Sequence, residues 1–368
     1  MTNKANEKSG LFFKGGSLKD KRLTSLCIVA VLCFPLLLGG CASKWGLRTE
    51  STGLPQQWPQ APASPKVVYT RSITGFDETG VSLPSLVKSF VFGEKAPGSL
   101  GRPSAVSAGR DGRLAVSDAG CGCVHLYIPS EERYLRLTGS RTAEFSSPVG
   151  VAFDEALRLY VSDSVSGEIY VFDKTGEFIF TFGKDYKPPL KRPTGLAYNY
   201  RDKLLYIADT LENKIYAADE KGGMAFSFGE RGAENGQFNF PVYIFWAPSG
   251  LYVVDTMNFR VEVFDSSGVF QSAFGRHGNG SGDFGMPKGI SVDSDGVIYV
   301  AENLFDNVQL FGPDGTFLLT VGSRGRDQGE FWMPSGMFAD TGGLLYVCDT
   351  YNSRVQVLRI ISNYGKMQ

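Results

Sequence analysis

The chain has 368 residues, of which 42% are apolar and 13% aromatic, and this composition excludes wholesale disorder. Its 45 glycines, 27 phenylalanines and 16 tyrosines favour many short strands joined by tight turns. A formal charge of −1 argues against nucleic-acid binding through bulk charge, and the two histidines, His125 and His277, exclude a three-histidine zinc site within one chain.

The N-terminal region has the pattern of an export signal. Residues 1–25 are polar and basic, and an apolar run follows over residues 26–38, which is short for a membrane span. The run ends in Leu38-Gly39-Gly40-Cys41, which resembles the bacterial lipobox. The resemblance implies that residues 1–40 are a lipoprotein signal peptide and that Cys41 carries the lipid. An uncleaved anchor helix is the alternative.

Removal of this signal would make the chain more acidic. Residues 1–40 hold six basic and two acidic residues, so the remainder carries a net charge of −5. Ala42 and Ser43 follow the cysteine where enteric inner-membrane lipoproteins have aspartate, so we expect a cell-envelope location at the outer membrane, facing the periplasm. Residues 41–66 are rich in proline, glutamine and serine and are expected to form a solvated tether.

A repeat of about 46 residues organises the rest, residues 67–368. Each unit contains a segment such as LYVVDTMNFRVEVFD (251–265), and a proline precedes each unit. The acidic residues at the shared position are spaced by 45 to 47: Asp118, Asp163, Asp209, Asp255, Glu302 and Asp349. Each unit alternates short apolar strands with polar turns, and no helical period is present beyond the signal, which predicts an all-β, six-bladed β-propeller with four strands per blade.

The unit resembles the NHL repeat. Blades four and six match its pattern most closely, at Tyr252, Asp255, Thr256, Asn258, Arg260 and Val261 and at Tyr346, Asp349, Thr350, Asn352, Arg354 and Val355. WD40-type and kelch propellers are the alternatives, but their Trp-Asp and double-glycine signatures are not in phase. The last unit lacks an outer strand, so we expect an N-terminal strand near residues 86–92 to complete it and close the ring. Residues 67–75 are expected to form an extra strand outside this count.

Strand order places the acidic residues and the glycine-rich loops between blades on one face, where propellers usually bind ligands. This site hypothesis rests on fold analogy. The acidic residues either ligate metal or accept backbone hydrogen bonds at turns, and their regular repetition favours turns. Glu302 departs from the repeat and is a candidate ligand contact.

Three basic residues stand five positions after an acid, namely Lys214, Arg260 and Arg354. They form either structural ion pairs or a basic arc that receives an anionic group. Tyr243 stands where other blades have glycine, near the channel mouth, as either a plug or a stacking platform. We count these residues as candidate ligand contacts at the channel mouth.

The remaining cysteines lie in an oxidising compartment if the chain is exported. Cys121 and Cys123 flank a single glycine in the blade-one loop and are a candidate redox or soft-metal site, the alternatives being a structural bridge or free thiols. Cys348 is expected to be a small core residue.

The sequence contains no convincing catalytic constellation, metal-binding set or cofactor motif. We therefore expect a lipid-anchored, non-enzymatic envelope protein whose propeller binds a protein, peptide or glycan partner. A metal-dependent envelope lyase or hydrolase with its site over the channel is the alternative, and RNA binding is disfavoured by charge and export.

Overall fold

The computed structural model describes residues 43–51, 56–79 and 98–361. The elements considered below lie in the second of two units of the chain, Lys44–Gln368. No helix of the described ranges is long and apolar enough to cross a membrane. The expected signal peptide and Cys41 lie outside the described residues.

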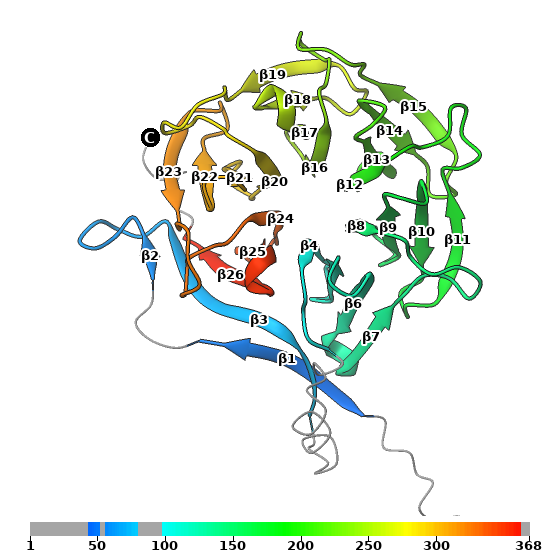
Figure 1. Cartoon of the computed structure of the whole chain (residues 1–368), viewed down its shortest axis with the longest axis horizontal. Helices are drawn as coiled ribbons and strands as arrows, with labels where there is room; N and C mark the ends of the chain where they lie inside the picture. Colours follow the sequence, from blue (N-terminus) through cyan, green and yellow to red (C-terminus); the bar gives the residue numbers. More distant parts are fainter. Residues whose placement is uncertain (1–42, 52–55, 80–97, 362–368) are drawn as a thin grey trace, which may run out of the picture. The chain divides into compact units, whose positions relative to one another are not determined.

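Six antiparallel four-stranded blades surround a central axis, as Figure 1 shows, which confirms the predicted all-β, six-bladed propeller. Each blade runs from an innermost to an outermost strand. The blades are β4 to β7 (Pro103–Ala108, Leu114–Asp118, Cys123–Ile128, Arg133–Leu137), β8 to β11 (Pro148–Phe153, Leu159–Asp163, Glu168–Phe172, Phe178–Phe182), β12 to β15 (Pro193–Asn199, Leu204–Asp209, Lys214–Ala218, Met224–Phe228), β16 to β19 (Pro241–Ala247, Gly250–Asp255, Arg260–Phe264, Phe270–Phe274), β20 to β23 (Pro287–Val292, Ile298–Glu302, Asn307–Phe311, Phe317–Val321), and β24 to β26 (Pro334–Ala339, Leu344–Asp349, Arg354–Ile360) with β3 (Val67–Thr79).

The polar turns inside the blades follow from Asx and glycine chemistry. In the turn between β20 and β21, the Asp293 carboxylate accepts hydrogen bonds from the backbone N–H groups of Asp295 and Val297, at 2.9 Å each. Gly296 completes this turn with a φ of +81°, which glycine adopts without a side-chain penalty. These turns connect strands whose apolar residues are buried.

The hydrophobic core is divided among the six contacts between neighbouring blades. Six clusters of buried side chains exist in the described residues, and each combines residues of two adjacent blades. Tyr160 of blade two, for example, packs in one cluster with Leu205 and Tyr216 of blade three. Every blade therefore depends on both neighbours to bury its faces.

An N-terminal strand completes the last blade, as expected, but it is not the predicted one. Strand β3 pairs antiparallel with β26, with Ile73 opposite Val355 and Val67 opposite Ile360. The Thr70 hydroxyl also donates to the Val357 carbonyl at 2.6 Å. The assignment of closure to residues 86–92 was therefore wrong, because the segment set aside as an extra strand, 67–75, takes that place. Residues 86–92 lie outside the described residues.

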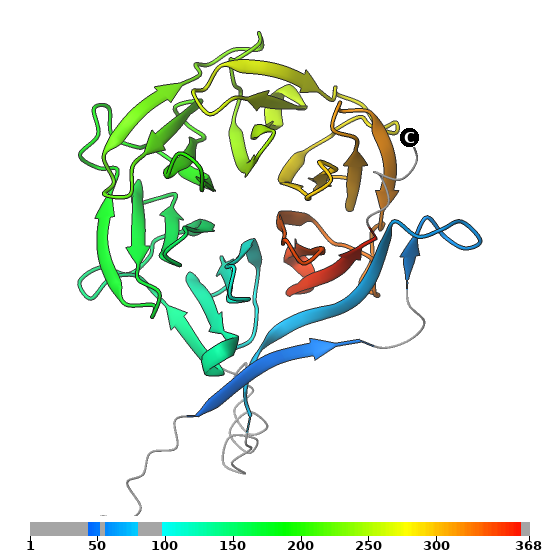
Figure 2. The same cartoon turned by 180° about the vertical axis from the view of Figure 1, so that it is seen from behind.

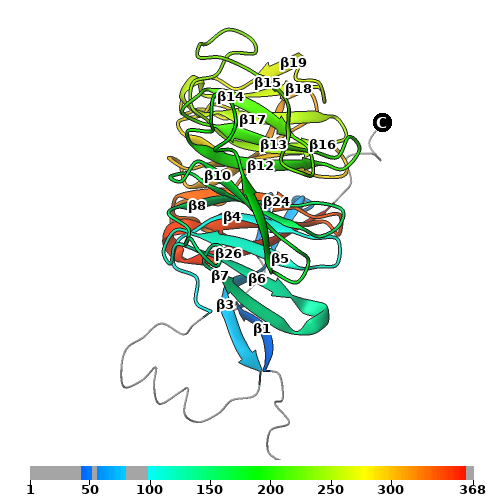
Figure 3. The ribbon, with the colours of Figure 1, turned by 90° about the vertical axis from the view of Figure 1, so that its right-hand side faces the viewer.

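The expectation of a solvated tether over residues 41–66 was wrong for two segments. Strand β1 (Lys44–Glu50) pairs antiparallel with β3, and β2 (Gln57–Trp58) pairs with the start of β3. Trp45 of β1 packs on Tyr134 of blade one, with ring centroids 4.8 Å apart. Strand pairing and this aromatic contact thus order a segment whose proline and glutamine content had predicted no ordered structure. Figures 2 and 3 show β1 running along β3 at the rim of the ring.

Candidate functional site

The acidic residue that ends the second strand of each blade binds the loop that enters the same blade. Asp163 accepts hydrogen bonds from the backbone N–H groups of Ser146 and Ser147, at 2.6 and 3.0 Å. The equivalent acids accept from the same loop in every blade, at Gly101, Lys191, Asn239, Gly285 and Trp332. The loops between blades and the loops after the second strands therefore share one face, called here the loop face, and the carboxylates hold them together.

Glu302 performs the same task despite its longer side chain. Its carboxylate accepts from the backbone N–H groups of Met286 and Leu304, at 2.7 and 3.1 Å, and burial raises its pKa. Asn303 donates to the Pro334 carbonyl at 2.9 Å, as Thr256 of blade four donates to a proline carbonyl of the next blade. The Glu-Asn pair thus replaces Asp-Thr with the same contacts.

The two arginines of the predicted basic arc direct their guanidinium groups into their own blades. Arg260 Nε donates to Asp255 at 3.0 Å, and its Nη2 donates to the carbonyl of Gln237 at 2.8 Å. Arg354 binds Asp349 and the Glu330 carbonyl in the same way. Both arginines therefore link the inter-blade loop to the acidic residue of their blade through hydrogen bonds.

Lys214 and Tyr243 complete the predicted channel-mouth set, and the structure does not bring either of them to the arginines. Lys214 begins β14 opposite Asp209. Tyr243 extends from β16 across the channel, and its hydroxyl donates to the Met337 carbonyl of blade six at 3.4 Å. Gly336 makes room for that hydroxyl, since a Cβ atom there would lie 2.9 Å from it. Burial raises the pKa of Tyr243, as expected for a phenol enclosed by packed strands.

The loop face exposes a repeated apolar position that the sequence analysis did not single out. Eight large apolar side chains are exposed in the described ranges, and five stand two residues after the acid of their blade. These five, called here the apolar arc, are 45 to 66% exposed: Val165, Leu211, Met257, Leu304 and Tyr351. Blade one has Gly120 at this position, so the arc is interrupted there.

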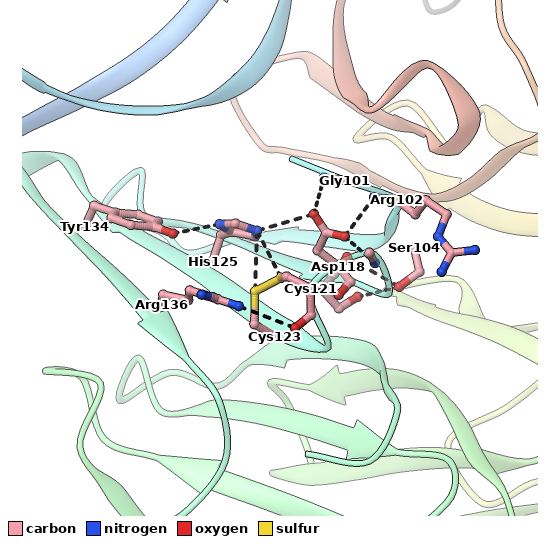
Figure 4. Close-up of a disulfide and its surroundings, with 11 residues drawn as sticks. Gly101, Arg102, Ser104, Asp118, Cys121, Cys123, His125, Tyr134 and Arg136 are labelled. Carbon is pink, nitrogen blue, oxygen red and sulfur yellow. Dashed lines mark hydrogen bonds and ion pairs between the residues drawn. A yellow bond between two sulfur atoms is a disulfide. The ribbon is translucent and has the colours of Figure 1, made fainter. Parts of the chain in front are cut away.

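Beside this interruption lies a disulfide between Cys121 and Cys123, with a Cα–Cα distance of 5.3 Å (Figure 4). Cys121 is half-buried in the loop, whereas Cys123 begins β6 and is fully buried. The ring of His125 follows on the same strand. Its Nε2 lies 3.7 Å from Cys121 Sγ and 3.6 Å from Cys123 Sγ.

His125 is held between an acid and a phenol. Nε2 lies 3.4 Å from Asp118 Oδ2, and Nδ1 lies 2.9 Å from the Tyr134 hydroxyl (Figure 4). Burial acts to raise the pKa of Asp118, but hydrogen bonds from His125 and from three backbone N–H groups outweigh it and lower the pKa to about 2. Burial raises the pKa of Tyr134 to about 12. Asp118 is therefore an ionised acceptor, and Tyr134 keeps its proton at neutral pH.

Sequence reasoning named Cys121 and Cys123 but missed His125. The available signal was strand alternation, because Cys123 and His125 are two residues apart and share one face of β6. Together Cys121, Cys123 and His125 are the one cluster of three potential metal-ligating side chains in the residues that the structure describes. In the disulfide form the two sulfur atoms are bonded to each other. Cys348 is a fully buried free thiol, as expected of a core residue.

The fold and its loop chemistry define a six-bladed β-propeller with NHL-type blades. Residues 331–358, in blade six, match the NHL repeat family. Residues 238–303 match a family described as a 6-bladed beta-propeller. No curated protein matches the chain by sequence.

Solved structures share the fold at low sequence identity. A catalytically inactive virginiamycin B lyase from Staphylococcus aureus with quinupristin has a TM-score of 0.53 and 11% identity, covering 71% of this chain and 95% of the lyase. An auxiliary nutrient binding protein from Bacteroides thetaiotaomicron has a TM-score of 0.54 and 13% identity, covering 72% and 70% of the two chains. Another from Bacteroides ovatus has a TM-score of 0.53 and 14% identity, covering 72% and 71%. At these identities the likeness shows the fold alone.

Proposed function

We propose that the protein is a lipid-anchored component of the cell envelope whose propeller docks a protein or peptide partner on its loop face. In this proposal Cys41 carries the lipid, and the propeller faces the periplasm from the outer membrane. The lipobox-like sequence supports the anchor. The apolar arc supports the docking surface.

The observation that carries the docking proposal is the concentration of exposed apolar side chains on one face. Five of the eight in the described residues occupy one repeated position, where a structural turn has no need of an apolar group. Half-buried Phe240, Met286 and Met333 precede the inner-strand prolines of the same face in blades four to six. Exposed apolar side chains gathered on one face of a protein are a feature of protein interaction sites.

The polar groups of the loop face favour binding over catalysis. Arg260, Arg354 and Glu302 are engaged within their own blades, so they are not free to activate a substrate. A binding role also agrees with the names of two Bacteroides neighbours, which are auxiliary nutrient binding proteins. The apolar arc favours a polypeptide over a glycan as the partner, since glycans present mainly polar groups.

A surface substitution with a matched control tests this proposal. The triple variant Leu211→Ser, Met257→Ser, Leu304→Ser removes the middle of the arc. The control Ile179→Ser, Met224→Ser, Val269→Ser removes the three exposed apolar side chains that lie on or beside outer strands. Both sets are exposed, so we expect similar melting temperatures for the two variants.

The readout is site-specific photo-crosslinking in intact cells. A crosslinker at Tyr351 should give a defined protein adduct in the wild type and the control, reduced at least tenfold in the arc variant. A crosslinker at Met224 should give none. Equal adducts from both positions, or an arc variant that crosslinks as the wild type does, would contradict the docking surface.

A further inference from the structure

The disulfide of blade one contributes little to the stability of the ring. A bridge that closes a loop of only three residues removes much less chain entropy from the unfolded state than a bridge that closes a long loop. The five other blades build the same loop without a bridge in the described residues. A structural explanation therefore leaves the presence of two cysteines in this one loop unaccounted for.

The two cysteines differ in burial. Cys121 is half-buried at the loop face, whereas Cys123 is fully buried on β6. We therefore expect an incoming thiolate to react at Cys121 rather than at Cys123. In thiol–disulfide exchange the attacked sulfur forms the mixed disulfide, and the other sulfur leaves as a thiolate.

The neighbours of His125 indicate which ring nitrogen carries a hydrogen. Asp118 is ionised and can only accept a hydrogen bond, so Nε2, which faces it at 3.4 Å, carries a hydrogen. Tyr134 keeps its proton and can donate it to Nδ1. The Nε2 N–H group also lies within 3.7 Å of both sulfur atoms. An N–H donor beside a cysteine stabilises its thiolate by a charge-assisted hydrogen bond.

We propose that Cys121 and Cys123 form a thiol–disulfide exchange site that oxidises dithiols, with His125 stabilising the leaving sulfur. A substrate thiolate attacks Cys121 Sγ, a new S–S bond forms, and the bond between Cys121 and Cys123 breaks. Its electron pair goes to Cys123 Sγ, 3.6 Å from His125 Nε2, and that thiolate takes up a proton. The second substrate thiolate then attacks the substrate sulfur and releases Cys121. The substrate loses two electrons and two protons, which Cys121 and Cys123 gain as thiols.

This activity differs from a purely structural role of His125. In blade six, Gln356 stands at the equivalent position and donates to Asp349 at 3.0 Å. A side chain at this position can therefore have a purely structural role, which is to hydrogen-bond the acidic residue. A structural histidine affects the melting temperature. A histidine that stabilises a leaving thiolate also affects the rate of disulfide reduction.

The first test compares the two cysteines in the full chain, with alkylation and peptide mass mapping to report each cysteine separately. With oxidised glutathione, the Cys123→Ser variant should form a mixed disulfide at Cys121. In the Cys121→Ser variant, oxidised glutathione should react with Cys123 at least tenfold more slowly. Equal rates at the two positions, or faster reaction at Cys123, would overturn the proposal.

The second test measures a single turnover with a reduced model peptide that contains two thiols. Wild-type protein should yield one peptide disulfide per chain while it remains folded. His125→Gln should slow this reaction at least tenfold. Tyr134→Phe, which removes only the hydroxyl that binds Nδ1, should slow it less at an unchanged melting temperature. Reduction that occurs only on unfolding, or unchanged rates in both variants, would overturn the proposal.

Discussion

Glu262 in blade four occupies the position that Gln356 holds in blade six. Both side chains accept a hydrogen bond from a glycine N–H of the inter-blade loop, Gly236 at 3.1 Å and Gly329 at 3.0 Å. Gln356 also donates its amide to Asp349. Glu262 has no such donor, and its Oε2 is buried without a hydrogen-bond partner. Burial raises the pKa of Glu262 to about 7.

The variant Glu262→Gln is therefore expected to stabilise the protein at alkaline pH. A protein that holds a carboxyl group with a folded pKa of about 7, above its ordinary pKa of 4.5, loses stability as pH rises from about 4.5 through 7. The amide avoids this loss and can donate as Gln356 does. We expect the free energy of unfolding to be higher by roughly 1 kcal/mol or more at pH 8, which for a domain of this size raises the melting temperature by about 1–2 °C for each kcal/mol, and a difference near zero at pH 4. An equal shift at both pH values would show that Glu262 does not titrate in this range.

Closure of the ring by β3 predicts a large effect of Ile73→Ala. Ile73 is fully buried between β1 and β26, opposite Thr49 and Val355, and its truncation should cost about 2–5 kcal/mol. Ile179→Ala is the matched control, because that side chain is 45% exposed on outer strand β11 and should cost less than about 0.5 kcal/mol. Denaturant unfolding of both variants checks this. Similar losses in the two would mean that β3 is not required for closure.

Tyr243 is expected to behave as a packing residue of the channel. Tyr243→Ala should destabilise the protein by about 3–5 kcal/mol, whereas Tyr243→Phe loses only a long hydrogen bond and should cost less than about 1 kcal/mol. Tyr351→Ala, at a tyrosine that is 48% exposed, should leave stability nearly unchanged but weaken docking on the loop face. Thermal melts and the crosslinking assay, with the crosslinker at Leu304, separate the two roles. Weakened docking in a stable Tyr243→Ala variant would instead identify a ligand contact.

The proposed lipid anchor gives a prediction that is independent of the propeller. Cys41→Ser removes the thiol that the lipobox-like sequence presents for acylation, so we expect no incorporation of labelled palmitate and accumulation of the unprocessed chain. Gel mobility and membrane fractionation provide the readout. Wild-type processing of this variant would exclude the lipoprotein assignment.

The blades were predictable because their information is local and repeated. Asp255, Thr256 and Arg260 each perform in blade four what Asp349, Thr350 and Arg354 perform in blade six, so the repeat in sequence became a repeat in structure. The closing strand was mispredicted because its partner is remote. Nothing in residues 67–75 alone shows that they pair with residues 355–360.

The candidate sites were harder to predict because a sequence position does not reveal whether a polar group is already bound. Arg260 and Arg354 matched a ligand-binding pattern, but their donors are engaged by backbone carbonyls of the inter-blade loop. The apolar arc was visible in the sequence as a repeated position. Recognising it required the exposure of Leu211 and Leu304, which depends on how the loops fold over the acids.

The pairing of β3 with β26 also determines when the protein can finish folding during synthesis. Thr70 and Val357, which are hydrogen-bonded, are separated by 287 positions, so the ribosome makes one long before the other. Until β26 emerges, β3 presents unpaired backbone groups to other nascent chains, and such edges promote aggregation. A chain that stalls before Arg354 would retain this open edge. Protection of β3 by chaperones during translation is therefore expected to matter more for yield than protection of any strand in blades two to five.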